Sequence, residues 1–374
     1  MAPDSDIPTF RIDLARSPED RYVDVAATFG PRIRTLGHVF DELLESMLGS
    51  KWLARIAKFL ARVFLRRVHD EEETREIRGF AKVARCDLFL VVALNVFLDV
   101  MMGCTAGCVK VKGKQVQDER LMHFRTLDWG LDPLRDLVVV LDVDGSKNLS
   151  LSLNYRPLHL CDNSHLKKHQ LLVILGFRPS VSSILRHTLF NQQKTETASS
   201  LVESAKQLAG VRSAPCYLAL CDGNHAVVIE KDLLTGRLRE NDRFIVQTNH
   251  DSCDATRCGT ELRSEPVTPH PELWLRDSND RMDVISDKWS DHCSTEASSD
   301  DEAVVVDDNK SSVKQETLRE WMMDMRISNG FTHFACIMDP ATGRVPWLRR
   351  GPAPEVKVDA DDAAKDEYSL THSP

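Results

Sequence analysis

Residues 101–130 read MMGCTAGCVKVKGKQVQDERLMHFRTLDWG, and this stretch decides the fold that we expect for the chain. Two strand-like runs within it flank a polar turn, which predicts an antiparallel hairpin. Cys104, directly after a glycine, would open the first strand. Arg125 and Asp128 would lie near the end of the second strand, and antiparallel pairing would return them to the start of the first. The hairpin is therefore predicted to gather a thiol, a guanidinium and a carboxylate.

The spacing of apolar residues differs on the two sides of Gly103. Ahead of it, residues 21–84 carry apolar side chains at helical spacing, and 86–103 form a buried apolar run, so the first hundred residues predict helices. After it, strand-like and helical patterns alternate, which predicts an α+β fold with predominantly antiparallel pairing. Beyond the first hairpin we expect a hairpin at 136–155, a helix at 197–210, strands at 214–222, 225–233 and 243–251, a helix at 317–328 and a hairpin at 331–350.

One predicted helix, between Lys51 and Arg67, is amphipathic. Its cations fall on one side and its large apolar residues on the other. We favour a helix that faces the core with a solvated basic side, and the alternative is a helix that lies on a membrane surface, where cations meet anionic headgroups. The two sets are Arg55, Lys58, Arg62 and Arg66, and opposite them Trp52, Ile56, Phe59, Leu60 and Val63.

The composition excludes several classes of protein. A net charge of −9 leaves no excess of cations to replace the counterions on phosphate, so we expect no nucleic-acid partner. Ten cysteines in 374 residues fall short of a disulfide scaffold. Cys253 and Cys258 have no matching pair of cysteines or histidines downstream, so zinc is not expected. We predict no metal and no organic cofactor.

The sequence predicts neither a signal peptide nor a membrane span, and two of its segments are expected to be unstructured. The N-terminus, MAPDSDIPTFRIDL, has acidic residues where a signal peptide needs basic ones. As written, the chain is expected in the cytoplasm, and in a lysosome or vacuole if the true N-terminus is missing. No apolar run is long enough to span a bilayer. The acidic, serine-rich stretch 294–312 and the tail 351–374 are expected to be unstructured.

A cut between Gly103 and Cys104 would make the cysteine an N-terminal residue. The pKa of a free α-amine is about 7.7–8.0, so this amine can take the proton of its own thiol. The preceding glycine leaves the carbonyl uncrowded, so the thiol could also make the cut. Arg125 would favour the thiolate and Asp128 could anchor the amine. The alternative for this Arg-x-x-Asp pair is a surface ion pair.

Several motifs, in order, resemble one family. NVFLDVMMGCTAG followed by HFRTLDWG is similar to the start of the catalytic chain of acid ceramidase and N-acylethanolamine acid amidase, in the cholylglycine-hydrolase-like branch of the N-terminal-nucleophile hydrolases. The likeness covers roughly residues 8–350, and several motifs are more specific than one. The other similar stretches are PTFRIDLARSPEDRY, LGFRPSV, SAPCYLALCDGNHAVVIEKD, FIVQTNHD and DSNDRMD.

The resemblance implies a set of site residues. Cys104 takes the position of the nucleophile, with Arg125 and Asp128 in the positions beside it. Asn249 takes the position of the asparagine whose amide donates to the oxyanion, and its alternative is a cap on a turn. Arg281 takes the position of a second arginine, and its alternative is a loop cation.

The resemblance also implies a fold and an activity. The fold is an αββα sandwich, with residues 1–103 as a helical α chain that stays with the β chain, 104–350. The activity is hydrolysis of the amide bond of N-acyl lipids, ceramide first, to a fatty acid and an amine. Alternatives are an N-acylethanolamine or other acyl amide as substrate, and a non-catalytic lipid-binding protein. His250 replaces the tyrosine of the family's motif, and 294–312 looks inserted.

Overall fold

A computed structural model describes most of the chain. The residues it describes are 7–97, 103–113, 118–129, 131–143, 149–156, 164–192, 200–252, 271–298 and 312–351. Cys253 and Cys258 lie outside them, as do 299–311 and the tail after Gly351. None of the described helices is both long and apolar enough to cross a bilayer.

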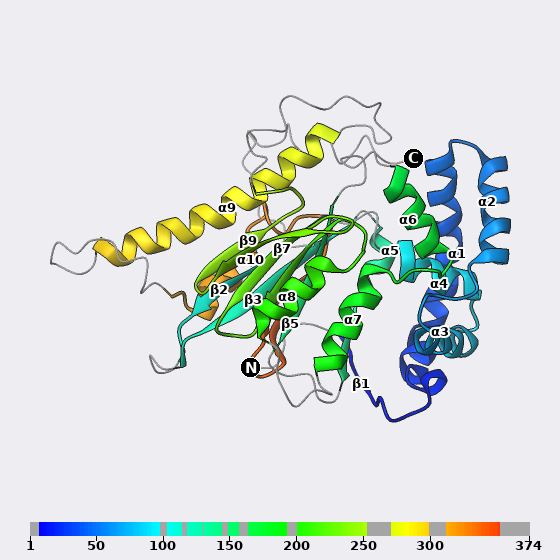
Figure 1. The fold of residues 1–374 in the computed structure, drawn as a ribbon, viewed down its shortest axis with the longest axis horizontal. Coiled ribbons are helices and arrows are strands. Elements are labelled where there is room, and N and C mark those ends of the chain that lie inside the picture. The colour runs from blue at the N-terminus through cyan, green and yellow to red at the C-terminus, as the bar shows by residue number, and fades with distance from the viewer. Residues whose placement is uncertain are drawn as a thin grey trace.

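Helices dominate the chain ahead of Gly103, as predicted. Figure 1 shows them as a bundle beside the sheets, joined by α6 from later in the chain. A capping side chain starts α3, because Asp70 accepts from the backbone N–H of Glu73 at 2.8 Å. The apolar run becomes the buried α4, which packs on α3. The helices are α1 (Val23–Leu48), α2 (Lys51–Phe64), α3 (Glu71–Ala84), α4 (Leu88–Phe97) and α6 (Ser164–Ile174).

Helix α2 turns its apolar side to solvent, so the core-facing interpretation is wrong. It packs on α1 and α4 through small residues such as Ala54 and Ala61, and Lys58 pairs with Asp41 at 2.6 Å. Figure 1 shows α2 at the outside of the bundle. Its large apolar side chains are between 37% and 66% exposed: Trp52, Leu53, Ile56, Phe59, Leu60, Val63 and Phe64.

The predicted hairpin at 103–128 is confirmed, and it lies inside a five-stranded antiparallel sheet. Gly103 pairs with Asp128 and Ala106 with Arg125, so both polar residues return to the start of the first strand. The strand order is β11-β10-β3-β2-β9. The strands are β2 (Gly103–Val111), β3 (Arg120–Asp128), β9 (Phe244–Gln247), β10 (Thr332–Asp339) and β11 (Arg344–Arg350).

A second antiparallel sheet, in the order β5-β6-β7-β8, stacks on the first. Small side chains, among them Ala106, Cys108 and Ala219, fill the space between the sheets. Helices α7 and α8 pack on this sheet, and α9 and α10 pack on the first. These elements are β5 (Ser150–Tyr155), β6 (Cys216–Cys221), β7 (Ala226–Lys231), β8 (Gly236–Asn241), α7 (Val181–Gln192), α8 (Leu201–Gly210), α9 (Pro271–Ser298) and α10 (Gln315–Met322).

The hairpin predicted at 136–155 does not form. Strand β4 (Val140–Val143) pairs in parallel with β1 (Thr9–Ile12), and β5 pairs with β6. Apolar alternation marks a strand but not its partner, and here both partners are distant in sequence. Short helical turns also occur at Pro18–Asp20 and at α5 (Asp132–Arg135).

Other elements were not predicted. These are β1, β8, α6, α7 and α9. Helix α9 runs to Ser298, so the first residues of the acidic stretch 294–312 are helical and not unstructured as predicted. The last residue of that stretch, Ser312, is buried and donates to Oε1 of Glu119 at 2.7 Å. The α+β class with mostly antiparallel pairing is confirmed.

Candidate active site

Cys104 is the second residue of β2, and its side chain is completely buried. Residues alternate across a strand, so Cys104 points towards the second sheet while Thr105 points towards α9. The guanidinium of Arg125 lies beside it, with Nη2 at 3.8 Å from the cysteine Sγ. The same Nη2 donates to the carbonyl of Leu153 on β5 at 2.9 Å, which fixes Arg125 between the two sheets.

Asn249 follows β9 and faces the backbone of the cysteine. Its Oδ1 accepts from the backbone N–H of Cys104 at 2.9 Å, and also from Nη2 of Arg281 at 3.2 Å. The side chain is 2% exposed. Because both bonds use the oxygen, the amide has a defined orientation beside the backbone of Cys104.

Arg281 reaches the same point from α9, on the other side of β2. Its Nη1 donates to the carbonyl of Cys104 at 2.7 Å and to Oγ1 of Thr105 at 2.9 Å. Its Nε pairs with Asp277, one helical turn earlier, at 2.9 Å. A loop cation is therefore not what the structure contains, because Arg281 is a buried helical residue with partners on two other elements.

Asp128 ends β3 and is 8% exposed, so the alternative of a surface ion pair is wrong. Thr332 on β10 donates to its Oδ1 at 2.6 Å, and Thr126 donates to Oδ2 at 3.4 Å. The nearest cation is Arg281, at 3.9 Å. Burial raises the pKa of Asp128 to about 6, although the Arg281 charge and the Thr332 hydrogen bond oppose the shift.

Burial also raises the pKa of the Cys104 thiol in the continuous chain. The charge of Arg125 lowers it and that of Asp128 raises it, but desolvation is the largest effect. The sulfur is consequently a thiol rather than a thiolate before any cut. A base next to the sulfur is needed to activate it.

A hydroxyl network around Asn249 was not predicted from the sequence. Oγ of Ser278 accepts from the backbone N–H of Asn249 at 2.8 Å and lies 2.9 Å from Nδ1 of His250. Thr248 closes the network, 3.0 Å from Ser278. Ser278 stands three residues before Arg281 on one helix, so helical spacing could have found it once α9 was known.

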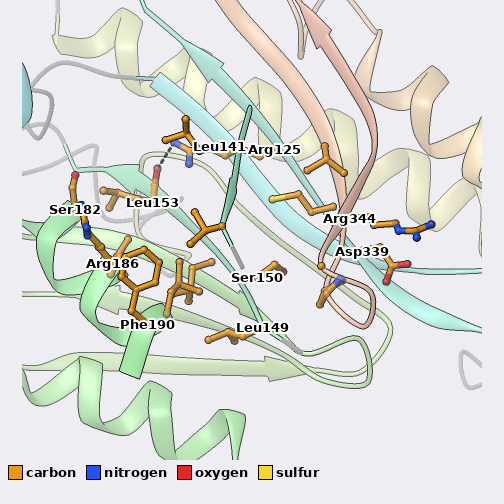
Figure 2. Close-up of a pocket in the computed structure, with 18 residues that line it drawn as sticks. Arg125, Leu141, Leu149, Ser150, Leu153, Ser182, Arg186, Phe190, Asp339 and Arg344 are labelled. Atoms are coloured by element: carbon orange, nitrogen blue, oxygen red, sulfur yellow. Dashed lines mark hydrogen bonds between the residues drawn. The ribbon is translucent and has the colours of Figure 1, made fainter. Parts of the chain in front are cut away.

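A cavity of about 560 Å³ adjoins this site, and Arg125 lines it. Figure 2 shows Arg125 bound to the Leu153 carbonyl among apolar side chains from β4, β5 and α7. Such a cavity is of the size that holds a small organic ligand, and its apolar wall suits a hydrocarbon chain. The apolar residues of the wall include Leu141, Leu149, Leu151, Leu185, Leu189 and Phe190.

The part of the chain that the structure describes has no group of three His, Cys, Asp or Glu side chains placed to hold a metal ion. Among the buried groups near the site, His123 lies between the hydroxyls of Ser150 and Ser152, at 2.7 and 2.8 Å. Burial lowers its pKa to about 3, so it is neutral and links the two sheets.

The raised pKa of Asp128 predicts a pH dependence of stability. The unfolded carboxyl has a pKa near ~3.9, so between about pH 4 and 6 the folded chain binds more protons than the unfolded one. The free energy of unfolding should therefore fall as pH rises through this window. Asp128→Asn should remove that part of the fall. Urea unfolding of the uncut Cys104→Ala chain, with and without Asp128→Asn, measures this, and identical pH slopes would contradict it.

The comparisons with known proteins concern a different part of the chain. Residues 5–69 match the family described as the beta subunit of N-acylethanolamine-hydrolyzing acid amidase. No curated protein matches the chain. The matched stretch lies wholly ahead of Cys104, whereas most of the motifs described above follow it. The match confirms that this chain resembles the family of acid ceramidase and N-acylethanolamine acid amidase.

Proposed function

We propose that the protein is an acyl-amide hydrolase of the N-terminal-nucleophile class, with Cys104 as the nucleophile. One observation carries the proposal. The backbone N–H of Cys104 donates a hydrogen bond to Oδ1 of Asn249, and the sulfur of Cys104 lies beside Arg125 in a buried site. After a cut at Gly103–Cys104 that nitrogen becomes the α-amine, and it already has an acceptor.

The cut itself needs only groups of this chain and water. The thiol of Cys104 attacks the carbonyl carbon of Gly103, forming a C–S bond. The C–N bond breaks and the nitrogen takes the thiol proton. Water then hydrolyses the thioester, which leaves a carboxylate on Gly103 and a free thiol and amine on Cys104.

Amide hydrolysis repeats the same chemistry on a bound substrate. The α-amine takes the thiol proton, and the thiolate attacks the amide carbonyl. The amide of Asn249 stabilises the oxyanion, Arg125 stabilises the thiolate and Asp128 orients the amine. The α-ammonium protonates the leaving amine, and water resolves the acyl thioester. Arg281 holds the cysteine carbonyl and Oδ1 of Asn249, so its role is to position both.

The cavity beside Arg125 supports a proposal for the substrate class. An apolar wall that reaches Arg125, whose guanidinium lies beside the sulfur of Cys104, suits the acyl chain of an N-acyl lipid with its amide near Cys104. We propose ceramide or an N-acylethanolamine as the substrate, and the description of the matching family supports the second. In the non-catalytic alternative, a lipid-binding protein, the buried arrangement of thiol, amide and guanidinia would have no use.

The first prediction concerns the cut. Purified protein should contain two chains, because the thiol of Cys104 cleaves the bond before it, and the larger chain should begin at Cys104. Cys104→Ala removes the attacking atom and should stay intact. Intact-mass analysis and Edman sequencing measure this. A start at another residue, or full activity in an uncut chain, would contradict it.

The second prediction concerns the oxyanion. Asn249→Ala should lower kcat on an N-acyl amide by about a hundredfold or more, because one oxyanion donor is lost. Steady-state kinetics on the fully cut variant measure the effect, and Asn224→Ala, at an exposed turn, is the matched control. A kcat within about threefold of wild type would remove Asn249 from the mechanism.

We also propose that α2 brings the enzyme to lipid surfaces. Its apolar side is exposed while Lys58 and Arg62 pair with Asp41 and Asp87. An N-acyl lipid is nearly insoluble as a monomer, so an enzyme that hydrolyses it meets it at an interface. The apolar side of α2 would enter the boundary between headgroups and acyl chains.

The third prediction tests this contact. Trp52→Ser with Phe59→Ser should weaken binding to phospholipid vesicles by roughly tenfold or more, because two large apolar side chains no longer leave water. Activity on a short, soluble acyl amide should survive. Vesicle co-sedimentation measures binding, and Leu234→Ser is the control, because Leu234 is 50% exposed in the turn between β7 and β8. Unchanged binding would exclude a membrane role for α2.

A further inference from the structure

Glu76 of α3 is a carboxylate that is only 4% exposed, and it holds two arginines. Nη1 of Arg21 donates to its Oε1 at 2.8 Å. Arg186 forms a two-pronged pair with it, Nη1 to Oε2 at 2.5 Å and Nη2 to Oε1 at 2.7 Å. Glu76 and Arg21 precede the proposed cut, whereas Arg186 follows it. The ionic cluster therefore joins the two future chains.

Arg186 lies on α7, and Glu76 is its shortest ionic partner. Glu73 lies farther from it, with Oε1 at 3.8 Å from Nε, and the hydroxyl of Tyr22 also contacts it. The ring of Phe190, one helical turn later, has its centroid 5.0 Å from the guanidinium carbon. Both Arg186 and Phe190 line the cavity beside Arg125, as Figure 2 shows. The pair with Glu76 thus helps to fix the place of one cation beside the apolar residues of the lining, which also includes Arg125, Asp339 and Arg344.

The cluster is strongly held because Glu76 and the side chain of Arg21 are buried and Arg186 is half-buried. Burial alone would lower the pKa of Arg186, but its hydrogen bonds and charge interaction with Glu76 raise it overall. Removing one partner of a buried pair leaves the other charge uncompensated, which is unfavourable. Without Glu76, Arg186 would keep its longer contact with Glu73, and the rest of its guanidinium would turn towards the cavity that it already lines.

We infer that Glu76 is a positioning residue for acyl-chain selectivity: by holding Arg186 against the wall, it keeps the cavity apolar enough for a long hydrocarbon chain. The inference rests on the proposed function. It assigns to the N-terminal segment, residues 1–103, a direct influence on a cavity built by the rest of the chain. Short acyl chains, which do not extend along this wall, would not depend on Glu76.

The test compares Glu76→Gln with wild type on a dodecanoyl and a butanoyl amide of the same amine. The ratio of kcat/KM for the long over the short substrate should fall by about tenfold or more, a size typical of a change in an apolar pocket. A ratio that stays within about twofold of wild type, or an equal loss on both substrates, would overturn the inference. Glu72→Gln is the matched control, because Glu72 contacts Arg21 but is 56% exposed, and its ratio should not change.

A double variant separates an effect of the Arg186 charge from a general loss of structure caused by Glu76→Gln. Adding Arg186→Met to Glu76→Gln removes the freed cation and leaves an apolar side chain, so the selectivity ratio should return towards wild type. A ratio that stays low would show that the cation is not the cause and would overturn the inference.

Two further results would separate failure of the inference from failure of the proposed function. If Glu76→Gln does not fold, Arg186→Lys keeps the charges balanced but cannot form the two-pronged pair, and it must lower the ratio, or the inference fails. If the fully cut wild type hydrolyses neither amide, the proposed function fails. The two failures are distinct, because failure of the inference alone leaves wild-type hydrolysis intact.

Discussion

The guanidinium of Arg281 is the group on which the arrangement of the site depends. It is almost completely buried, and a buried charge is tolerated only where it is paired and hydrogen-bonded. Its partners lie on three parts of the chain, so the requirement to satisfy one side chain fixes α9, the start of β2 and the loop after β9 together. Those partners are Asp277, Thr105, Cys104 and Asn249.

The same burial sets the chemistry of the neighbouring groups. It raises the pKa of both Asp128 and Cys104, against the nearby charges of Arg281 and Arg125. A site that is dry enough to keep a thiol protonated beside a guanidinium is also one in which a hydrogen-bond donor stabilises an oxyanion strongly. Desolvation therefore keeps the Cys104 thiol protonated and weakly reactive in the continuous chain. In the proposed mechanism, it would favour the reaction once an α-amine is present to take the thiol proton.

Local signals in the sequence were sufficient for some elements and not for others. The hairpin of β2 and β3 was predictable because its two strands are adjacent in sequence and joined by a polar turn, and it brought Arg125 and Asp128 to the start of β2. The partner of β4 was not, because a strand pattern contains no record of which distant segment it meets. For α2 the spacing of cations and apolar residues correctly predicted a basic face and an apolar face. It did not indicate which of the two faces the neighbouring helices would cover.

The site shows the same division. The five residues placed by resemblance come together because the motifs fix their spacing on the strands and on α9. Ser278 and Thr332 were not found, since serine and threonine are common and nothing local marks the ones that end beside a buried amide or carboxylate. Glu76 was hidden for a related reason. On the sequence it is one of several acidic residues at the start of a helix, and only tertiary packing separates it from Glu72.

The parallel pair of β1 and β4 makes the folding of the protein less reversible after the proposed cut than before it. Thr9–Ile12 belongs to the segment ahead of Cys104, and Val140–Val143 belongs to the segment after it, so backbone hydrogen bonds cross the proposed cut. A continuous chain can re-form that pair after a transient opening, because its ends are tethered. Two separate chains must find each other again, at a rate that depends on their concentration. Before the cut, the stability of the fold is an equilibrium property of one chain. After the cut, the lifetime of the folded protein would depend on the rate at which the two chains dissociate.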